Sequence, residues 1–397
     1  MTSQVRFEQR MCADGINQIA IATLDNPSSL NALTFEMLKQ LHDLLLHWRD
    51  DPTIVCIVLE GEGEKAFCAG GDVRAMHDVM KNQSKTQIQA FCRGYFTLEY
   101  QCDYLIHTFP KPIVAWGQGI IMGGGMGLFM GASHKVVTPN SRLAMPEVSI
   151  GLFPDVGATW FLNQLDNGIG MFLGMTGTMV NASDATEIRL ADHVLLEDSR
   201  TTLVETLQIQ YWPKESSGES CIQDEYKSIV SDVLSLVSEH AASEIESEKP
   251  SLQLMPFYRQ IQSACSSHHV SDVWQNITEI DTEGVEETAL KWMEGAKLTL
   301  TTGSPITAHL CFRQMTNYTE LPLADCFRLE LGLAINCSLL GEFQEGVRAR
   351  LIDKDGEPQW LYPTVDSVDI DVIDDLFMSL WQPDLHPLAQ LDQQSSK

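Results

Sequence analysis

The sequence predicts an α/β protein followed by a helical C-terminal part. Over residues 1–205, short apolar segments typical of buried strands alternate with segments of helical periodicity. Residues 206–282 are more polar and acidic, which is typical of a mostly helical insertion or linker. Helical patterns return over residues 283–397, and we expect this region to pack on the first one. The chain has 397 residues, 44% of them hydrophobic, which is enough to bury a substantial core.

The first elements are a hairpin and an amphipathic helix. Alternating apolar positions flank Asp14-Gly15, a dipeptide that strongly favours a turn between two strands. Thr34 is suited to begin a helix as its N-cap, because apolar residues recur after it every three or four positions. These residues are Leu38, Leu41, Leu45 and Trp48.

The alternation continues along the chain. Buried strands are predicted from "TIVCIVLEG" (53–61), "KPIVAWGQ" (111–118) and "HKVVTP" (134–139). Helices are predicted from "DVRAMHDVMKN" (72–82), "VGATWFLNQL" (156–165), "GVEETALKWMEGAKLTL" (284–300), "PITAHLCFRQM" (305–315) and "LADCFRLELGLAINCSL" (323–339). The last eight residues, "QLDQQSSK", are typical of a loose tail.

Charge and cysteine usage exclude several classes of protein. The formal net charge of −28 leaves no basic footprint, which argues against nucleic acid or an anionic membrane as a general partner. No run approaches about 18 apolar residues, so we expect no membrane span. The ten cysteines form no CxxC pair, which favours reduced thiols over a disulfide framework or a zinc site. The opening residues lack the apolar core of a secretion signal, so we expect a cytoplasmic protein, with a processed mitochondrial matrix protein as the alternative.

Two acids stand in an otherwise apolar segment, "AMPEVSIGLFPDVGATWFL" (144–162). Buried carboxylates cost free energy unless they are paired, hydrogen-bonded or functional, so Glu147 and Asp155 are candidate site residues. The alternatives are that Glu147 is an acid at a turn or helix start and that Asp155 is the N-cap of the following helix.

Two glycine-rich segments, 65–76 and 116–132, each lead from a strand into a helix. Free backbone N–H groups at a helix N-terminus stabilise negative charge, and two such ends brought together can hold an oxyanion. The glycines can also serve only tight turns and close packing. A dinucleotide site is disfavoured, because Gly117, Gly119 and Gly123 give only GxGxxxG with no acid placed to bind a ribose.

The order and spacing of four motifs resemble the enoyl-CoA hydratase/isomerase (crotonase) superfamily. The pair Glu99-Tyr100 and two C-terminal blocks resemble its 3-hydroxyisobutyryl-CoA hydrolase branch. The four motifs are "LNALT" (30–34), "AFCAGGDVRAM" (66–76), "KPIVAWGQGIIMGGGMGL" (111–128) and the segment 144–162, and the blocks are "SPITAHLCFRQM" (304–315) and "GEFQEGVRARLIDKDGEPQW" (341–360).

This resemblance implies a crotonase-like spiral of ββα turns that binds an acyl-CoA thioester. By analogy, the N–H groups of Gly71 and Gly124 form the oxyanion hole for the thioester carbonyl, and the Ala69 carbonyl faces the adenine amino group. Lys65 is either a phosphate contact or only a solvated surface charge.

One departure from the hydratases is informative. They carry a second catalytic Glu two residues after the triple glycine, where this chain has Gly127, whereas Asp155 matches an acid of the hydrolase branch. Glu147 is therefore the expected reactive carboxylate, attacking the carbonyl or activating water. Asp155 is expected to bind the substrate's 3-hydroxyl or to orient Glu147 or water. Glu99 is either a substrate contact or an exposed helix position.

One cysteine and three histidines are interpreted as structural or exposed residues. Cys68 lacks a neighbouring His in the motifs and is interpreted as a small buried thiol. His193 and the pair His268-His269 lack metal-ligand spacing, so no metal is expected.

The predicted function is hydrolysis of 3-hydroxyisobutyryl-CoA in valine catabolism, with no cofactor beyond the coenzyme A of the substrate. A hydratase or isomerase of the same fold and a non-catalytic acyl-CoA-binding protein are the alternatives. The expected partner is the small-molecule substrate, and a homo-oligomer stays open.

Overall fold

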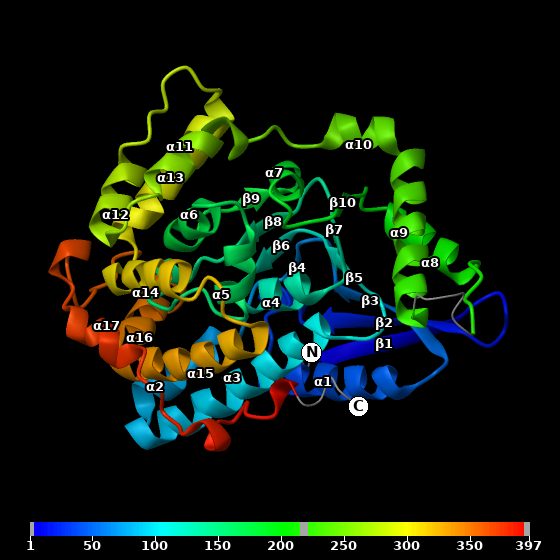
Figure 1. Cartoon of the computed structure of the whole chain (residues 1–397), viewed down its shortest axis with the longest axis horizontal. Coiled ribbons are helices and arrows are strands. Elements are labelled where there is room, and N and C mark those ends of the chain that lie inside the picture. Colours follow the sequence, from blue (N-terminus) through cyan, green and yellow to red (C-terminus); the bar gives the residue numbers. More distant parts are fainter. Residues whose placement is uncertain (1–3, 215–220, 393–397) are drawn as a thin grey trace. The chain divides into compact units, whose positions relative to one another are not determined.

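The computed structural model describes residues 4–214 and 221–392 (Figure 1). The chain forms two compact units, each built from three separate segments. Unit 1 comprises Met1–Gly71, Leu105–Leu143 and Asn181–Ser251, and unit 2 comprises Asp72–Tyr104, Ala144–Val180 and Leu252–Lys397. Six residues of the predicted insertion (215–220) and most of the predicted tail (393–397) lie outside the described residues.

A six-stranded sheet forms the centre of unit 1. Its order is β1-β2-β3-β5-β7-β10, with β1 antiparallel to β2 and every later pair parallel. Buried Ile, Val and Ala side chains line β2 and β3, as expected for strands that are covered on both faces. The strands are β1 (Gln4–Met11), β2 (Gln18–Asp25), β3 (Ile54–Gly61), β5 (Ile113–Gly117), β7 (His134–Val137) and β10 (His193–Val194).

The helices of unit 1 cover this sheet. In Figure 1, α1 runs along β1 and β2, and α8 and α9 pack against β2 and β3. These helices bury apolar stripes, and α9 does so although it lies in the acidic part of the sequence. The helices are α1 (Phe35–Asp50), α4 (Gly124–Gly131), α7 (Ala182–Glu187), α8 (Ser199–Gln208), α9 (Ile222–His240) and α10 (Ala242–Glu248), with a 3₁₀ turn η1 (Pro27–Ser29).

The hairpin and the first helix confirm the local predictions. The Asp14 carboxylate accepts the N–H groups of Ile16 and Asn17, at 2.9 Å each, and so closes the turn between β1 and β2. The Thr34 hydroxyl accepts the Met37 N–H at 3.2 Å at the start of α1. The predicted apolar stripe of α1 is buried.

A second, short sheet has the order β4-β6-β8-β9. Its strands are β4 (Ala66–Cys68), β6 (Ile120–Met122), β8 (Arg142–Ala144) and β9 (Val180–Asn181). β4 and β6 run parallel, so the two glycine-rich segments that follow them leave the sheet in the same direction.

Unit 2 is almost entirely helical. Phe327 of α15 packs against Tyr100 and Tyr104 of α3, with ring centroids 5.7 and 6.1 Å apart, and α14 packs on α6. The longer helices are α2 (Val73–Asn82), α3 (Lys85–His107), α6 (Ile169–Thr176), α12 (Val270–Thr278), α13 (Glu287–Thr302), α14 (Pro305–Asn317) and α15 (Leu323–Leu340). The short ones are η2 (Glu147–Ser149), α5 (Ala158–Phe161), η3 (Leu162–Gln164), η4 (Met255–Phe257), α11 (Tyr258–Ala264), α16 (Glu342–Val347), the π-helical η5 (Arg348–Ile352), η6 (Val365–Ser367), α17 (Ile370–Leu376) and η7 (Pro383–Leu385).

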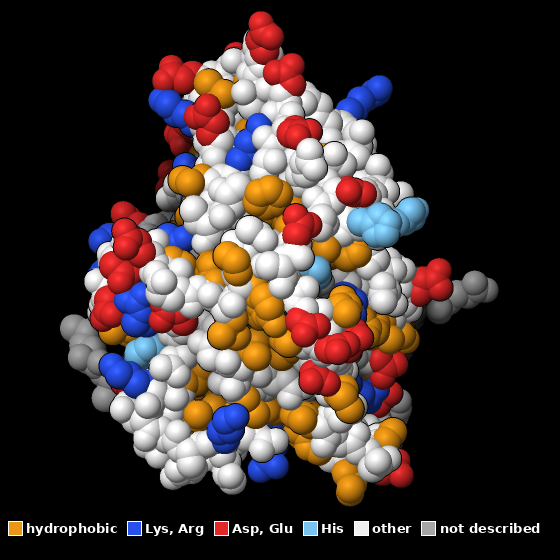
Figure 2. Space-filling view, turned by 90° about the vertical axis from the view of Figure 1, so that its left-hand side faces the viewer, with side chains coloured by type: hydrophobic (Ala, Val, Ile, Leu, Met, Phe, Trp, Pro, Cys, Tyr) orange, Lys and Arg blue, Asp and Glu red, His pale blue; other side chains and the backbone are white. Residues whose placement is uncertain are grey.

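The excess of acidic residues is visible on the surface. On the face drawn in Figure 2, Asp and Glu side chains are scattered widely, and hydrophobic side chains gather in its middle. In the described part of the chain, no helix is both long enough and apolar enough to span a lipid bilayer.

Candidate active site

The two glycine-rich segments meet in unit 1. A Cβ atom placed on Gly125 would lie 2.2 Å from the Cys68 carbonyl oxygen, so only glycine allows this contact of two backbones. Gly70, at φ +112°, also lies beside the triple glycine: a Cβ atom there would be in ordinary van der Waals contact with the Gly124 nitrogen, at 3.8 Å. The structure therefore brings the segments of the predicted oxyanion hole together.

The N–H group of Gly124 is suited to bind negative charge. Gly124 is the first residue of α4, and the N–H groups of a first helical turn have no acceptor within their helix. Its N-cap, Gly123, adopts φ +49°, which turns the chain sharply from β6 into α4. Gly127 lies inside α4, whose residues include no acid.

Around this pair of loops, Ala69 is half-buried and donates its N–H to the Leu30 carbonyl at 2.9 Å, whereas Lys65 is exposed. Their assignments to adenine and phosphate stay predictions. Cys68 is completely buried, as expected for a small structural thiol.

A group of carboxyl side chains is buried in unit 2, and we call it the acid cluster. Its members are at most 4% exposed, and, in addition to burial, the charge of one member, Asp155, raises the pKa of each of the other four. They come from four elements: α3, η2, the turn before α5, and α15. The members are Glu99, Asp103, Glu147, Asp155 and Glu330.

Asp155 is held by Tyr100, whose hydroxyl donates to its Oδ2 at 2.7 Å. Other oxygens of the acid cluster have no hydrogen-bond partner among the described residues: Glu99 Oε1, Glu147 Oε2 and both oxygens of Asp103. Buried oxygens without a hydrogen-bond partner are rare in proteins, and a catalytic role is one of the recognised reasons for them. Glu99 is 2% exposed, so the alternative that it occupies an exposed helix position is wrong.

Glu330 reaches the turn that follows Asp155. Its carboxylate oxygens accept the N–H groups of Gly157 at 2.7 Å and Thr159 at 2.9 Å. Gly157 is the N-cap residue of α5 and has no side chain to cap it. The alternative that Asp155 caps this helix is therefore wrong, because Glu330 binds these N–H groups and the Asp155 side chain binds Tyr100.

Burial raises the pKa of every acid in the cluster. Burial raises the pKa of Asp155 to about 7, although the hydrogen bond from Tyr100 opposes the shift. The pKa values of Glu147 and Glu99 are raised well above the ordinary range of a Glu, mainly by burial and secondly by the negative charge of Asp155. Asp155 can therefore hold or release a proton near neutral pH, which suits general acid–base chemistry.

Sequence reasoning missed Asp103, Glu330 and the Tyr100 hydrogen bond. Asp103 lies four residues after Glu99, so both acids share one face of α3. Glu330 is an acid inside the apolar helix α15, the same signal that identified Glu147 and Asp155. This signal was available in the sequence, but the contact partners were not.

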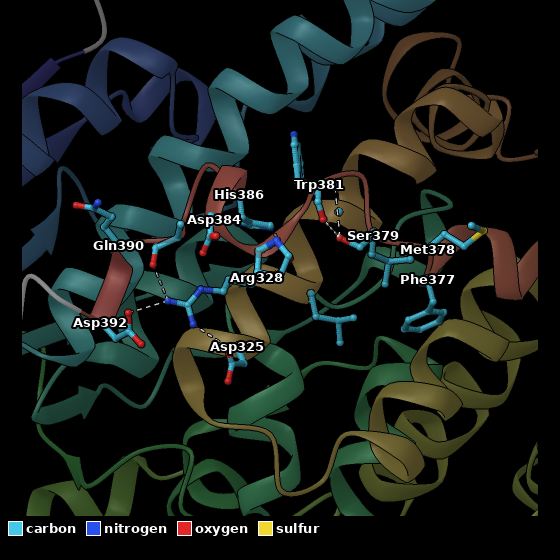
Figure 3. A pocket seen from close by; sticks show the side chains of 15 residues that line it. Asp325, Arg328, Phe377, Met378, Ser379, Trp381, Asp384, His386, Gln390 and Asp392 are labelled. Atoms are coloured by element: carbon cyan, nitrogen blue, oxygen red, sulfur yellow. Dashed lines mark hydrogen bonds and ion pairs between the residues drawn. The ribbon is translucent and has the colours of Figure 1, made fainter.

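A pocket of about 620 Å³ lies elsewhere in unit 2, between α15 and residues 377–392 (Figure 3). Arg328 crosses it and donates to Asp325 at 2.6 Å and to Asp392 at 2.8 Å. None of the residues predicted for the site lines this pocket. Among the described residues, no group of three or more His, Cys, Asp or Glu side chains is placed to hold a metal ion, and His268 and His269 are exposed.

Comparison with known proteins decides the family. A model of the enoyl-CoA hydratase/isomerase family matches residues 19–377. The chain belongs to this family. A solved enoyl-CoA hydratase from Rhodobacter sphaeroides has the same fold, with a TM-score of 0.75 and 26% identity over 95% of this chain and 98% of the other. The crotonase-like fold predicted from the motifs is thereby confirmed.

Within the family, this chain is similar over nearly its whole length to proteins named 3-hydroxyisobutyryl-CoA hydrolase, mitochondrial. The Gallus gallus protein is 34% identical over 92% of this chain and 88% of the relative. The Homo sapiens protein is 31% identical over 96% of this chain and 90% of the relative.

Proposed function

We propose that this chain hydrolyses the thioester of 3-hydroxyisobutyryl-CoA to 3-hydroxyisobutyrate and coenzyme A, a step of valine catabolism. The observation that carries the proposal is its near full-length similarity to family members with this name. Two features of the chain agree with it: a buried acid cluster in unit 2, and an α4 helix without the second acid that hydration of a double bond requires.

In this proposal the glycine segments act on the carbonyl group. The N–H groups of Gly71 and Gly124 receive the thioester carbonyl oxygen and stabilise the negative charge that develops on it during attack. Removing one donor from a comparable oxyanion hole costs about 2.7–4 kcal/mol of transition-state stabilisation.

Glu147 is the reactive carboxylate. Either its oxygen attacks the carbonyl carbon, the C–S bond breaks and water then cleaves the mixed anhydride, or Glu147 removes a proton from the attacking water. In both routes the coenzyme A leaves as a thiolate. Because the pKa of the corresponding thiol is only about 8.5, a strong general acid is unnecessary. Both routes also require ionised Glu147, so its raised pKa places the acidic limb of the rate profile above the usual range of a Glu.

Asp155 and Glu99 recognise the substrate. The ionised Asp155 carboxylate accepts a hydrogen bond from the 3-hydroxyl group, and Glu99 provides a second polar contact. A site built to bond a hydroxyl group discriminates strongly against an analogue that lacks it, because its polar group is then left unpaired. Isobutyryl-CoA, which lacks the hydroxyl, is therefore a poor substrate in this proposal.

The substitution Asp155→Asn tests this role. It keeps an acceptor oxygen and removes the charge, so we expect a lower kcat/KM on 3-hydroxyisobutyryl-CoA and a much smaller change on isobutyryl-CoA. Equal losses on both substrates would instead assign Asp155 to orienting Glu147 or water. The loss of ultraviolet thioester absorbance is the preferred assay, because exposed Cys221 would react with thiol reagents.

The reaction is proposed to need no metal and no cofactor beyond the coenzyme A of the substrate. Turnover by the purified protein should be unchanged after incubation with a strong chelator. Activity that is lost on chelation and restored by a divalent cation would contradict this part of the proposal.

A further inference from the structure

The turn that carries Asp155 has an unusual backbone. Val156 and Gly157 follow Asp155 directly and adopt φ values of +54° and +87°. A β-branched residue rarely enters this left-handed region, and it stays there only when the surrounding structure forces it to. Val156 is 1% exposed, so its neighbours are in a position to do so.

Glu330 fixes the C-terminal side of this turn. Its two oxygens each accept one backbone N–H, from Gly157 and from Thr159. The side chain is completely buried, and burial raises its pKa to about 8, while both hydrogen bonds oppose that shift. Burying a carboxyl group costs free energy, and Ser or Asn at the N-cap would be enough to bind the free N–H groups of this four-residue helix.

Gln314 of α14 fixes both ends of the same turn. Its Nε2 donates to the Pro154 carbonyl and to the Thr159 hydroxyl, at 2.8 Å each. Gln314 is also completely buried. Helix α14 therefore binds the backbone immediately before Asp155, and α15 binds it two and four residues after Asp155.

We propose that Glu330 and Gln314 are positioning residues that hold the 154–159 turn so that Asp155 presents its carboxylate to the 3-hydroxyl group of the substrate. Tyr100 binds one oxygen of Asp155, and the two positioning residues fix the backbone from which that side chain extends. The inference rests on the proposed role of Asp155 and extends it to the C-terminal helices.

The substitution Glu330→Gln tests the inference. An amide has only one acceptor oxygen, so its NH₂ group would face one of the two backbone donors. We expect kcat/KM on 3-hydroxyisobutyryl-CoA to fall about tenfold to a hundredfold, the scale of an ångström-sized misplacement. On isobutyryl-CoA, which makes no hydroxyl contact, we expect less than about a threefold change, because the lost interaction concerns only the hydroxyl group.

Two further variants separate positioning from folding. Gln314→Met removes both donated hydrogen bonds without disturbing a buried acid, and it should shift the selectivity in the same direction even if Glu330→Gln does not fold. Glu60→Gln is the matched control in unit 1, since Glu60 is a buried acid that accepts hydrogen bonds from Thr23 and Arg200. It should lower the melting temperature with the selectivity unchanged.

The outcomes are distinct. Loss of the preference for the hydroxylated substrate in Glu330→Gln or Gln314→Met, with a folded protein by circular dichroism, supports the inference. A lower melting temperature with both kcat/KM values unchanged would show that these residues only stabilise the fold, and would overturn the inference. A wild-type protein that does not prefer the hydroxylated substrate would instead refute the proposed role of Asp155.

Discussion

Removing the Tyr100 hydroxyl should shift the pH at which the enzyme gains activity. The phenol donates to Asp155 Oδ2 at 2.7 Å inside the protein and thereby stabilises the ionised carboxylate. A hydrogen bond to a charged group contributes about 1.5–3 kcal/mol, and one pKa unit corresponds to about 1.4 kcal/mol. Tyr100→Phe should therefore raise the pKa of Asp155 from about 7 by about one to two units.

This shift predicts a specific pH profile. If ionised Asp155 binds the substrate hydroxyl, its ionised fraction at pH 7 falls from about one half to between about 1% and 10%, and kcat/KM falls about fivefold to fiftyfold. Activity should recover at higher pH, because the carboxylate is still present. The assay is kcat/KM for 3-hydroxyisobutyryl-CoA across the pH range, with Tyr226→Phe, which loses a hydroxyl bonded to the Pro213 carbonyl, as the control. The limb set by Glu147 is common to both substrates, so a preference for 3-hydroxyisobutyryl-CoA over isobutyryl-CoA that keeps its wild-type pH dependence would refute the reasoning.

Three further predictions concern chemistry, stability and packing. Glu147→Gln should lower kcat by at least about 10²-fold, the scale of a lost general base, and near-wild-type turnover would show that another group reacts. Relative to wild type, the free energy of unfolding of Asp103→Asn should rise with pH, by up to about 1.4 kcal/mol per pH unit, because the raised pKa keeps folded Asp103 protonated while the unfolded chain releases its proton. A difference in melting temperature between variant and wild type that is the same at pH 5 and pH 8 would contradict this. Gly125→Ala should destabilise the fold by about 1–3 kcal/mol or more, because its Cβ would meet the Cys68 carbonyl, whereas Gly94→Ala, which has open space, should not; equal melting temperatures for the two variants would contradict the close contact of the glycine segments.

Local sequence signals were sufficient for much of the fold. The Asp14 turn and the Thr34 cap depend on residues within three positions of each other, and the apolar stripe of α1 follows from helical periodicity alone. The predicted helix over 156–165 is instead a single turn of α5 followed by the 3₁₀ turn η3, because Val156 and Gly157 are left-handed and delay its start.

The candidate site was predicted only in part. Acids in an apolar segment identified Glu147 and Asp155, since the cost of burying a carboxylate is visible in the sequence itself. The bonds of Glu330 to Gly157 and Thr159 connect residues more than 170 positions apart. Such contacts depend on how α15 packs against α5, which no local pattern specifies.

The most direct test of the account compares two reactions of the purified protein: hydrolysis of 3-hydroxyisobutyryl-CoA and hydration of crotonyl-CoA. Because α4 lacks a second acid and the acid cluster includes Asp155, the account predicts rapid thioester cleavage and no appreciable hydration. Hydration of crotonyl-CoA that is faster than thioester cleavage would contradict it.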